Sequence, residues 1–194
     1  MEFIHVMRIG ILGGTFNPIH KGHIKLASGA RRKLKLDKII FVPANIPPHK
    51  IGLNILPAKE RYKMVSLALK ALPYFDVSDY EIMSKGTSYS IKTIKAFKRK
   101  FGKNAKLFFL TGSDSLSQLN MWKHLDKIIN LSEFVTVNRP GHKVIDVEGI
   151  TAINIPTLNI SSSDIRGRVK KGLSVEKFLP KQVYEYIKKR GFYK

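Results

Sequence analysis

Short apolar runs alternate with longer amphipathic segments along the chain. The runs at residues 8–12 (RIGIL), 38–42 (KIIFV) and 106–110 (KLFFL) are rich in β-branched and aromatic residues, which is typical of buried strands. Further strands are predicted at residues 75–83, 134–137 and 150–155. Apolar residues recur at helical spacing in the segments between them, which predicts helices at residues 24–34, 58–72, 88–101, 122–131, 162–171 and 180–190.

This alternation of strands and helices is typical of βαβ units joined by right-handed crossovers. It predicts an α/β fold: a Rossmann-like, doubly wound parallel sheet with helices on both faces. The chain has no internal repeat or long linker, so we expect residues 1–194 to form a single domain. A sheet of this kind binds its ligand beyond the carboxyl ends of its strands.

The charge of the chain indicates a partner that is an anion. Lys and Arg number 35 against 14 Asp and Glu, a formal net charge of +21. Nucleic acid, anionic lipid and phosphorylated small molecules are all compatible with this excess. The densest basic runs lie near the ends of predicted helices, where cations oppose the helix dipole, so many of them are also explained as solvated helix ends.

Cysteine is absent, which narrows the chemistry. The chain has 0 Cys, so disulfides, thiol nucleophiles, iron–sulfur clusters and cysteine-based zinc sites are excluded. No apolar run is long enough to span a membrane, and the first residues lack the pattern of a cleavable leader. We therefore expect a cytoplasmic protein without a membrane partner, whose catalysis would depend on His, carboxylates, hydroxyls, amides and cations.

The loop after the first strand carries the most informative motif, residues 13–23 (GGTFNPIHKGH). Gly13 and Gly14 let backbone approach a ligand closely, and the helix that follows offers free N–H groups to a phosphate. The glycine spacing fits neither a Walker A loop nor a dinucleotide fingerprint. His20 and His23 can both face the bound anion and donate hydrogen bonds to a phosphoryl oxygen. A zinc site is disfavoured, because the chain lacks the Glu of H-E-x-x-H and any Cys.

A second group of polar residues opens the helix predicted at residues 162–171. Ser161, Ser162 and Ser163 can cap this helix, and Arg166 can present its guanidinium to a phosphate. Taken alone, the pattern is equally typical of an N-cap followed by a surface arginine. It gains meaning because helix starts at one edge of a parallel sheet converge in space.

Residues 13–23 and 161–166 resemble the phosphate-binding motifs of the nucleotidyltransferase superfamily that carries the H-x-G-H signature. Further motifs are similar to those of the bacterial nicotinate-mononucleotide adenylyltransferase family within it, in the right order: residues 43–50 (PANIPPHK), 87–90 (TSYS), 112–115 (GSDS), 139–141 (RPG) and 191–193 (GFY). The chain departs from the family pattern at Asn17, Ser90, Asn138 and Ser163. Of these, Asn17 removes a negative charge beside the phosphate loop.

The resemblance implies transfer of AMP from ATP to nicotinate mononucleotide, giving deamido-NAD and pyrophosphate; a sister enzyme acting on nicotinamide mononucleotide or another phosphorylated acceptor is the alternative. It implies catalytic roles for His20, His23 and Arg166. The implied ATP site adds Gly13, Gly14, Thr15, Phe16, Ser161 and Ser163. The implied acceptor site comprises Asn45, His49, Lys50, Ser88, Tyr89, Ser90, Gly112, Asp114 and Trp122. Mg²⁺ would travel with ATP, and no metal-binding residues of the protein itself are expected.

Several of these residues also have a plain structural explanation. Trp122 could pack in the core, Asp114 could cap a helix, and His49 and Lys50 could lie on a solvated loop. Two other classes of protein fit the sequence less well. A nucleic-acid-binding domain would carry a recognisable motif, which the chain lacks, and a non-catalytic phosphate sensor has no need for paired histidines. No nucleic-acid partner is therefore expected, and a homo-oligomer is compatible with the sequence.

Overall fold

The computed structural model describes residues 5–48, 55–84, 86–113, 122–138, 147–156 and 158–194. Six parallel strands form one sheet in the order β3-β2-β1-β4-β5-β6. The strands are β1 (Met7–Gly14), β2 (Lys38–Pro43), β3 (Phe75–Val77), β4 (Ala105–Gly112), β5 (Glu133–Asn138) and β6 (Ile150–Asn154). This is the Rossmann-like order, which confirms the predicted fold class, and it places the point where the winding reverses between β1 and β4.

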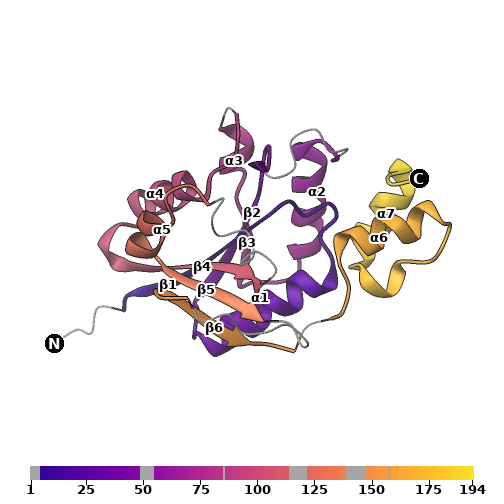
Figure 1. Ribbon diagram of the computed structural model, residues 1–194. Helices are drawn as coiled ribbons and strands as arrows, with labels where there is room; N and C mark the ends of the chain where they lie inside the picture. The colour runs from indigo at the N-terminus through magenta and orange to yellow at the C-terminus, as the bar shows by residue number, and fades with distance from the viewer. Residues whose placement is uncertain (1–4, 49–54, 85, 114–121, 139–146, 157) are drawn as a thin grey trace.

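Helices cover both faces of the sheet (Figure 1). The helices are α1 (Lys21–Lys33), α2 (Ala58–Leu69), α3 (Tyr80–Met83), α4 (Ser90–Phe101), α5 (Leu125–Leu131), α6 (Ser162–Lys170) and α7 (Lys181–Arg190), with short 3₁₀ turns η2 (Gly102–Asn104) and η4 (Glu176–Phe178). One face packs against α1, α2, α6 and α7. The other packs against α4 and α5.

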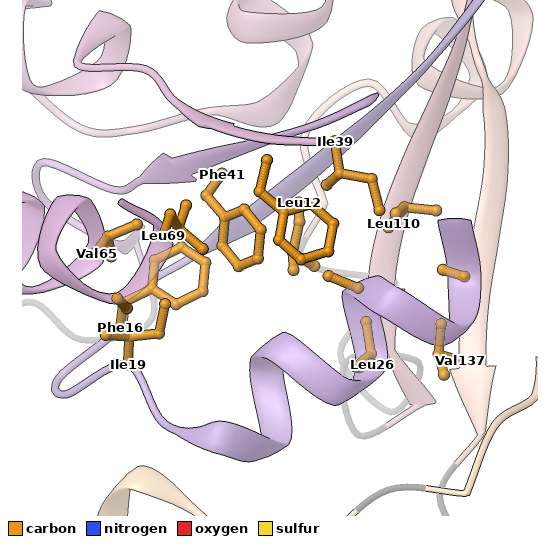
Figure 2. Packing of buried hydrophobic residues seen from close by; sticks show 14 of the residues in the cluster. Leu12, Phe16, Ile19, Leu26, Ile39, Phe41, Val65, Leu69, Leu110 and Val137 are labelled. Carbon is orange, nitrogen blue, oxygen red and sulfur yellow. The ribbon is translucent and has the colours of Figure 1, made fainter. Parts of the chain in front are cut away.

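Side chains of β1 alternate between the two cores. Ile9 and Ile11 are fully buried on the α4 face, and Leu12 packs on the α1 face with Phe16 and Phe41, as Figure 2 shows. Gly10 is also required on the α1 face, because a Cβ atom there would lie 2.9 Å from side-chain atoms of Leu36 and Ile39. The two buried faces explain why this strand reads as a nearly continuous apolar run.

The prediction of a strand over residues 75–83 was wrong beyond Val77. The Ser78 hydroxyl accepts the N–H of Tyr80 at 3.2 Å, and a single helical turn, α3, follows. That turn buries Glu81. Three predicted helices are shorter in the structure. Helix α2 ends at Leu69 instead of residue 72, α4 begins at Ser90 instead of residue 88, and α5 begins at Leu125 instead of residue 122.

Within the described part of the chain, no helix combines the length and apolar character needed to cross a bilayer.

Candidate active site

The loop between β1 and α1 is built around a buried aromatic ring. Phe16 is 2% exposed, with its ring centroid 5.7 Å from that of Phe41 and 5.1 Å from that of His23. Gly14 makes room for this ring, since a Cβ there would lie 2.8 Å from Phe16 Cζ. At Gly13 the nearest atoms would stand 3.8 Å away. Phe16 thus supports the loop from inside, and its ring is not exposed at the surface.

His20 and His23 stack at the start of α1. Their ring centroids lie 3.7 Å apart at an interplanar angle of 32°, and His20 is 1% exposed. The backbone N–H of His20 donates to Nδ1 of His23 at 3.2 Å. Because Nδ1 is the acceptor, the proton of a neutral His23 ring lies on Nε2. A neutral His23 therefore presents an Nε2–H donor.

Gly22 between the two histidines is required by the His20 ring. A Cβ at this position would lie 2.8 Å from His20 Nδ1 and 2.9 Å from Cε1. The ring could clear the added methyl group only by moving off its stack with His23.

We expect Gly22→Ala to lower kcat by about tenfold or more, because a displaced catalytic group loses its preorganised geometry. Gly167→Ala is the matched control, since Gly167 lies within helix α6 and a Cβ there meets nothing within 4 Å. That control should keep its kcat and gain up to about 1 kcal/mol of stability. Equal kinetics for the two variants would contradict the steric role of Gly22.

The first turn of α6 is tied to the loop before α1. The Ser162 hydroxyl donates to Pro18 O at 2.9 Å, and Arg166 donates to Asn17 O at 2.8 Å and to Ser163 Oγ at 3.2 Å. The two predicted phosphate-binding motifs, about 140 residues apart in sequence, therefore meet at one edge of the sheet. Arg166 belongs to the second motif, is half-buried, and bonds to the first motif through Asn17 O.

Ser161 serves as the N-cap of α6. Its hydroxyl accepts the N–H of Asp164 at 3.1 Å and donates to the Asp164 carboxylate at 2.7 Å. The Ser161 hydroxyl and the Ser161 backbone N–H, at 2.9 Å, both donate to this carboxylate and lower the pKa of Asp164, and the electrostatic interaction with His20 lowers it further. The structural explanation of Ser161 is thus realised, and the cap carboxylate lies close enough to His20 to interact with it electrostatically.

Sequence reasoning missed Arg61, which joins two loops of the site. Arg61 is 1% exposed and donates to Thr15 O at 2.8 Å, Asn45 O at 2.8 Å and Leu56 O at 2.9 Å. Burial lowers the pKa of its guanidinium. It lies in a charged run, KERYK, which is typical of a solvated helix face, so its local sequence gave no signal.

The C-terminal residues reach the same loop. Tyr193 Oη donates to Asn17 Oδ1 at 2.8 Å. Burial raises the pKa of the Tyr193 phenol above its usual value of 10.0, against the positive charges of Arg166 and Arg61. Asn17 stands where the family usually has Asp, and its side-chain oxygen still accepts this hydrogen bond. The Asn therefore preserves the bond between Tyr193 and the loop before α1.

At the same edge of the sheet, the loop after β2 pairs with the segment before α4. The Asn45 N–H donates to Ser88 Oγ at 2.8 Å, and the Ser88 N–H donates to Ile46 O at 3.0 Å. Tyr89 is the N-cap of α4 and Ser90 its first residue. Four residues predicted to bind the acceptor, Asn45, Ser88, Tyr89 and Ser90, are therefore brought together.

The remaining predicted acceptor residues have different placements. Gly112 ends β4 beside β1, at the same edge as Gly14. Trp122 packs its ring on Phe109 and Phe134, with centroids 5.5 Å and 5.4 Å away, and is only partly buried. Trp122 thus packs in the core, which was the structural alternative to a role at the acceptor. Three predicted residues lie outside the described residues: His49, Lys50 and Asp114.

A buried carboxylate, Glu81, lies behind the acceptor side. Glu81 is 8% exposed and accepts a hydrogen bond from the Thr93 hydroxyl. Burial raises its pKa above the usual 4.5, and the nearby hydroxyls of Thr93 and Ser88 oppose the rise. The sequence predicts a strand over residues 75–83 and gives no signal that singles out Glu81.

The raised pKa of Glu81 gives a prediction for stability. The folded state holds the ionised carboxylate at a cost that the unfolded chain lacks, so this cost is largest above the folded pKa and vanishes below about pH 4.5. We expect Glu81→Gln to match or exceed the parent in melting temperature at pH 7. The difference should shrink as the pH falls towards 4.5, in thermal denaturation followed by circular dichroism. A variant that is more stable than the parent only at acidic pH would contradict this sign.

No group of three or more His, Asp or Glu side chains suited to holding a metal ion occurs among the described residues. The site is instead a set of hydrogen-bond donors and cations around the β1–α1 loop.

The chain belongs to the cytidylyltransferase-like family, whose sequence model matches residues 11–168. A Thermoanaerobacter protein (strain X514) named "Probable nicotinate-nucleotide adenylyltransferase" is 42% identical over 97% of this chain and 95% of its own length. A Moorella thermoacetica protein with the same name is 41% identical over 96% and 92%. These similarities confirm the family resemblance drawn from the motifs.

Solved structures agree on the fold. Plasmodium falciparum nicotinic acid mononucleotide adenylyltransferase complexed with NaAD superposes with a TM-score of 0.80 at 22% identity, covering 96% of this chain and 97% of that one. The same enzyme complexed with APC gives a TM-score of 0.77 at 21% identity, with the same coverage. At these identities the likeness establishes the architecture alone.

Proposed function

We propose that this chain, acting as a single nucleotidyltransferase domain, transfers AMP from ATP to nicotinate mononucleotide, yielding deamido-NAD and pyrophosphate in NAD biosynthesis. The observation that carries the proposal is the attachment of the α6 motif to the His20–His23 loop, in which Arg166 bonds to the loop that leads to the paired histidines. Relatives about 40% identical over nearly their full length bear the name of this activity.

The reaction suits these residues because it needs no general base. A phosphate oxygen of the mononucleotide, already anionic, attacks the α-phosphorus of ATP; a new P–O bond forms, the bond to the bridging α–β oxygen breaks, and pyrophosphate leaves. Catalysis then consists of positioning and of stabilising charge on the phosphoryl oxygens. His23, as an Nε2–H donor, would contact the transferred phosphoryl group, with His20 beside it.

The leaving pyrophosphate would meet the α6 side of the site. Arg166 offers a guanidinium already oriented by Asn17 O and Ser163 Oγ, and Ser161 and Ser163 complete that side. The amino end of α1 adds a partial positive charge, and the buried guanidinium of Arg61 lies behind the loop. Gly13, with Thr15, would let the triphosphate approach the backbone.

A divalent metal accompanies ATP in nucleotidyl transfer, and we propose Mg²⁺ for this protein. It would enter as part of the substrate Mg–ATP and neutralise charge on the phosphate oxygens.

The acceptor would bind at the same edge of the sheet, beside the loop after β2. The backbone N–H groups at the start of α4, at Tyr89 and Ser90, favour a carboxylate and hence nicotinate over its amide. Asn45 borders the same position. The acceptor site would be completed by His49 and Lys50 at the phosphate, Asp114 and Gly112 at the ribose, and Trp122 at the pyridine ring.

Pyrophosphate release from purified protein, Mg–ATP and a panel of acceptors tests this proposal. We expect the highest kcat/KM with nicotinate mononucleotide, ahead of nicotinamide mononucleotide and pantetheine phosphate. A folded protein that releases no pyrophosphate with any acceptor would refute the proposed enzymatic activity. A higher kcat/KM with another acceptor would instead identify a sister adenylyltransferase.

A further inference from the structure

The chain turns back sharply after α7, and this turn brings Tyr193 to the loop before α1. The Phe192 N–H donates to Ile187 O at 3.1 Å, as in a Schellman motif, and Gly191 supplies the left-handed conformation that the turn requires, with φ of 64°. Tyr193 is left-handed too, with φ of 67°, which is unfavourable for a residue with a side chain. Such a conformation persists where surrounding contacts hold it.

Asn17 accepts hydrogen bonds from two segments that are far apart in the sequence. Its side-chain Oδ1 accepts the phenol proton of Tyr193 at 2.8 Å, and its backbone oxygen accepts from the guanidinium of Arg166 at 2.8 Å. Asn17 is 4% exposed, so water competes little for either bond. The segment after α7 and the first turns of α6 are therefore bonded to the same buried residue.

The orientation of the Arg166 guanidinium depends on Asn17. Its Nη1 donates to Asn17 O, and its Nη2 donates to Ser163 Oγ at 3.2 Å. A guanidinium has more N–H donors than these two bonds use, so it can also hold an anion. Since Ser163 and Arg166 lie in the same helix, it is the bond to Asn17 that sets the guanidinium relative to the loop before α1.

We propose that Tyr193 is a positioning residue for the leaving pyrophosphate, acting through Asn17 to fix the guanidinium of Arg166. The inference rests on the proposed function, which places the leaving group at Arg166. It assigns Tyr193 no contact with a substrate, because the phenol hydroxyl donates to Asn17. The segment after α7 therefore serves the reaction as well as the packing of its helix.

Tyr193→Phe tests the proposal, because it removes the phenol oxygen and keeps the ring. We expect the Kd for inorganic pyrophosphate with Mg²⁺, measured by isothermal titration calorimetry, to rise about fivefold to tenfold, the effect of roughly one hydrogen bond. The kcat/KM for ATP should fall by a similar factor, and KM for nicotinate mononucleotide should stay within about twofold of the parent. A purely structural role would lower the melting temperature and leave the pyrophosphate affinity unchanged.

Tyr186→Phe is the matched control. The Tyr186 phenol donates to Glu60 Oε2 at 2.5 Å, so this variant removes a hydroxyl that joins α7 to α2 and leaves the bond from Tyr193 to Asn17 in place. We expect it to lower the melting temperature while keeping the Kd for pyrophosphate within about twofold of the parent.

Two further variants identify the route. Asn17→Ala removes the acceptor of the Tyr193 bond but keeps the backbone oxygen that Arg166 uses, so it should reproduce the weaker pyrophosphate binding of Tyr193→Phe. Arg166→Met should itself weaken pyrophosphate binding. Adding Tyr193→Phe to Arg166→Met should weaken it no further, because both changes break one chain of contacts.

The outcomes separate the two proposals. If Tyr193→Phe keeps the Kd for pyrophosphate of the parent, or if Tyr186→Phe raises it equally, Tyr193 is only a structural residue and the inference fails. If Tyr193→Phe does not fold, the comparison of Asn17→Ala with Tyr186→Phe decides. A folded parent that binds pyrophosphate but releases none from ATP with any acceptor overturns the proposed function, whereas the affinities of the variants still decide the role of Tyr193.

Discussion

Replacing His23 by Ala should lower kcat by at least about 10²-fold, the usual result of removing one preorganised donor to a developing negative charge. The structure gives a reason for so large an effect: Nδ1 of His23 is held by the His20 N–H, which leaves Nε2–H as the donor. The variant should be assayed for pyrophosphate release at saturating Mg–ATP and nicotinate mononucleotide. KM for ATP should change much less than kcat, because the lost contact strengthens in the transition state.

His5→Ala is the control for this prediction. The His5 side chain is 74% exposed and pairs with Asp37 near the start of β1. Its removal should leave kcat within about twofold. Near-normal turnover by a folded His23→Ala variant would contradict the assignment of His23 to the transferred phosphoryl group.

The His20–His23 motif could be found from the sequence because it is local. Its residues lie within one loop and the first turn of one helix, so their spacing determines their relative placement. The same is true of the basic runs, which were predicted at helix ends and do lie in the last turns of α1, α4 and α7. Patterns confined to a few residues carry over to the structure with little change.

Arg61, Glu81 and Tyr193 could not be found in this way. The roles of Arg61 and Tyr193 depend on partners 46 and 176 positions away, which no periodicity reveals. Glu81 was missed because its segment alternates like a strand in the sequence, whereas in the structure the strand ends at Val77 and helix α3 follows. Arg61 and Glu81 are buried and Tyr193 is half-buried, and the partners of each come from other segments of the chain.

The sequence also could not separate contact with a ligand from support of the loop. Phe16 lies within the phosphate motif, yet its ring is buried beneath it. Ser161 was expected at a phosphate, and its hydroxyl is engaged by Asp164 in the α6 cap. A motif identifies which residues a site requires, whereas burial and hydrogen-bond partners show how each of them serves it.

Arg61→Met should produce the largest loss of stability, about 3 kcal/mol, seen as a melting temperature lower by roughly 6–12 °C. Met fills most of the space but donates no hydrogen bond, so three carbonyl oxygens, of Thr15, Asn45 and Leu56, lose their donor. Removing the desolvated charge offsets part of this loss. Because both the phosphate loop and the Asn45 loop are released, kcat/KM should also fall about tenfold or more.

Arg168→Met provides the comparison. Arg168 in α6 is only half-buried and donates to a single carbonyl, Ser174 O at 3.1 Å, while stacking on Phe178. Its replacement should cost no more than about 1 kcal/mol and leave kcat/KM near that of the parent. Equal melting temperatures for the two variants would show that the Arg61 charge costs as much as its bonds contribute. The loops would then be held by their backbone contacts alone, and Arg61 would have no positioning role.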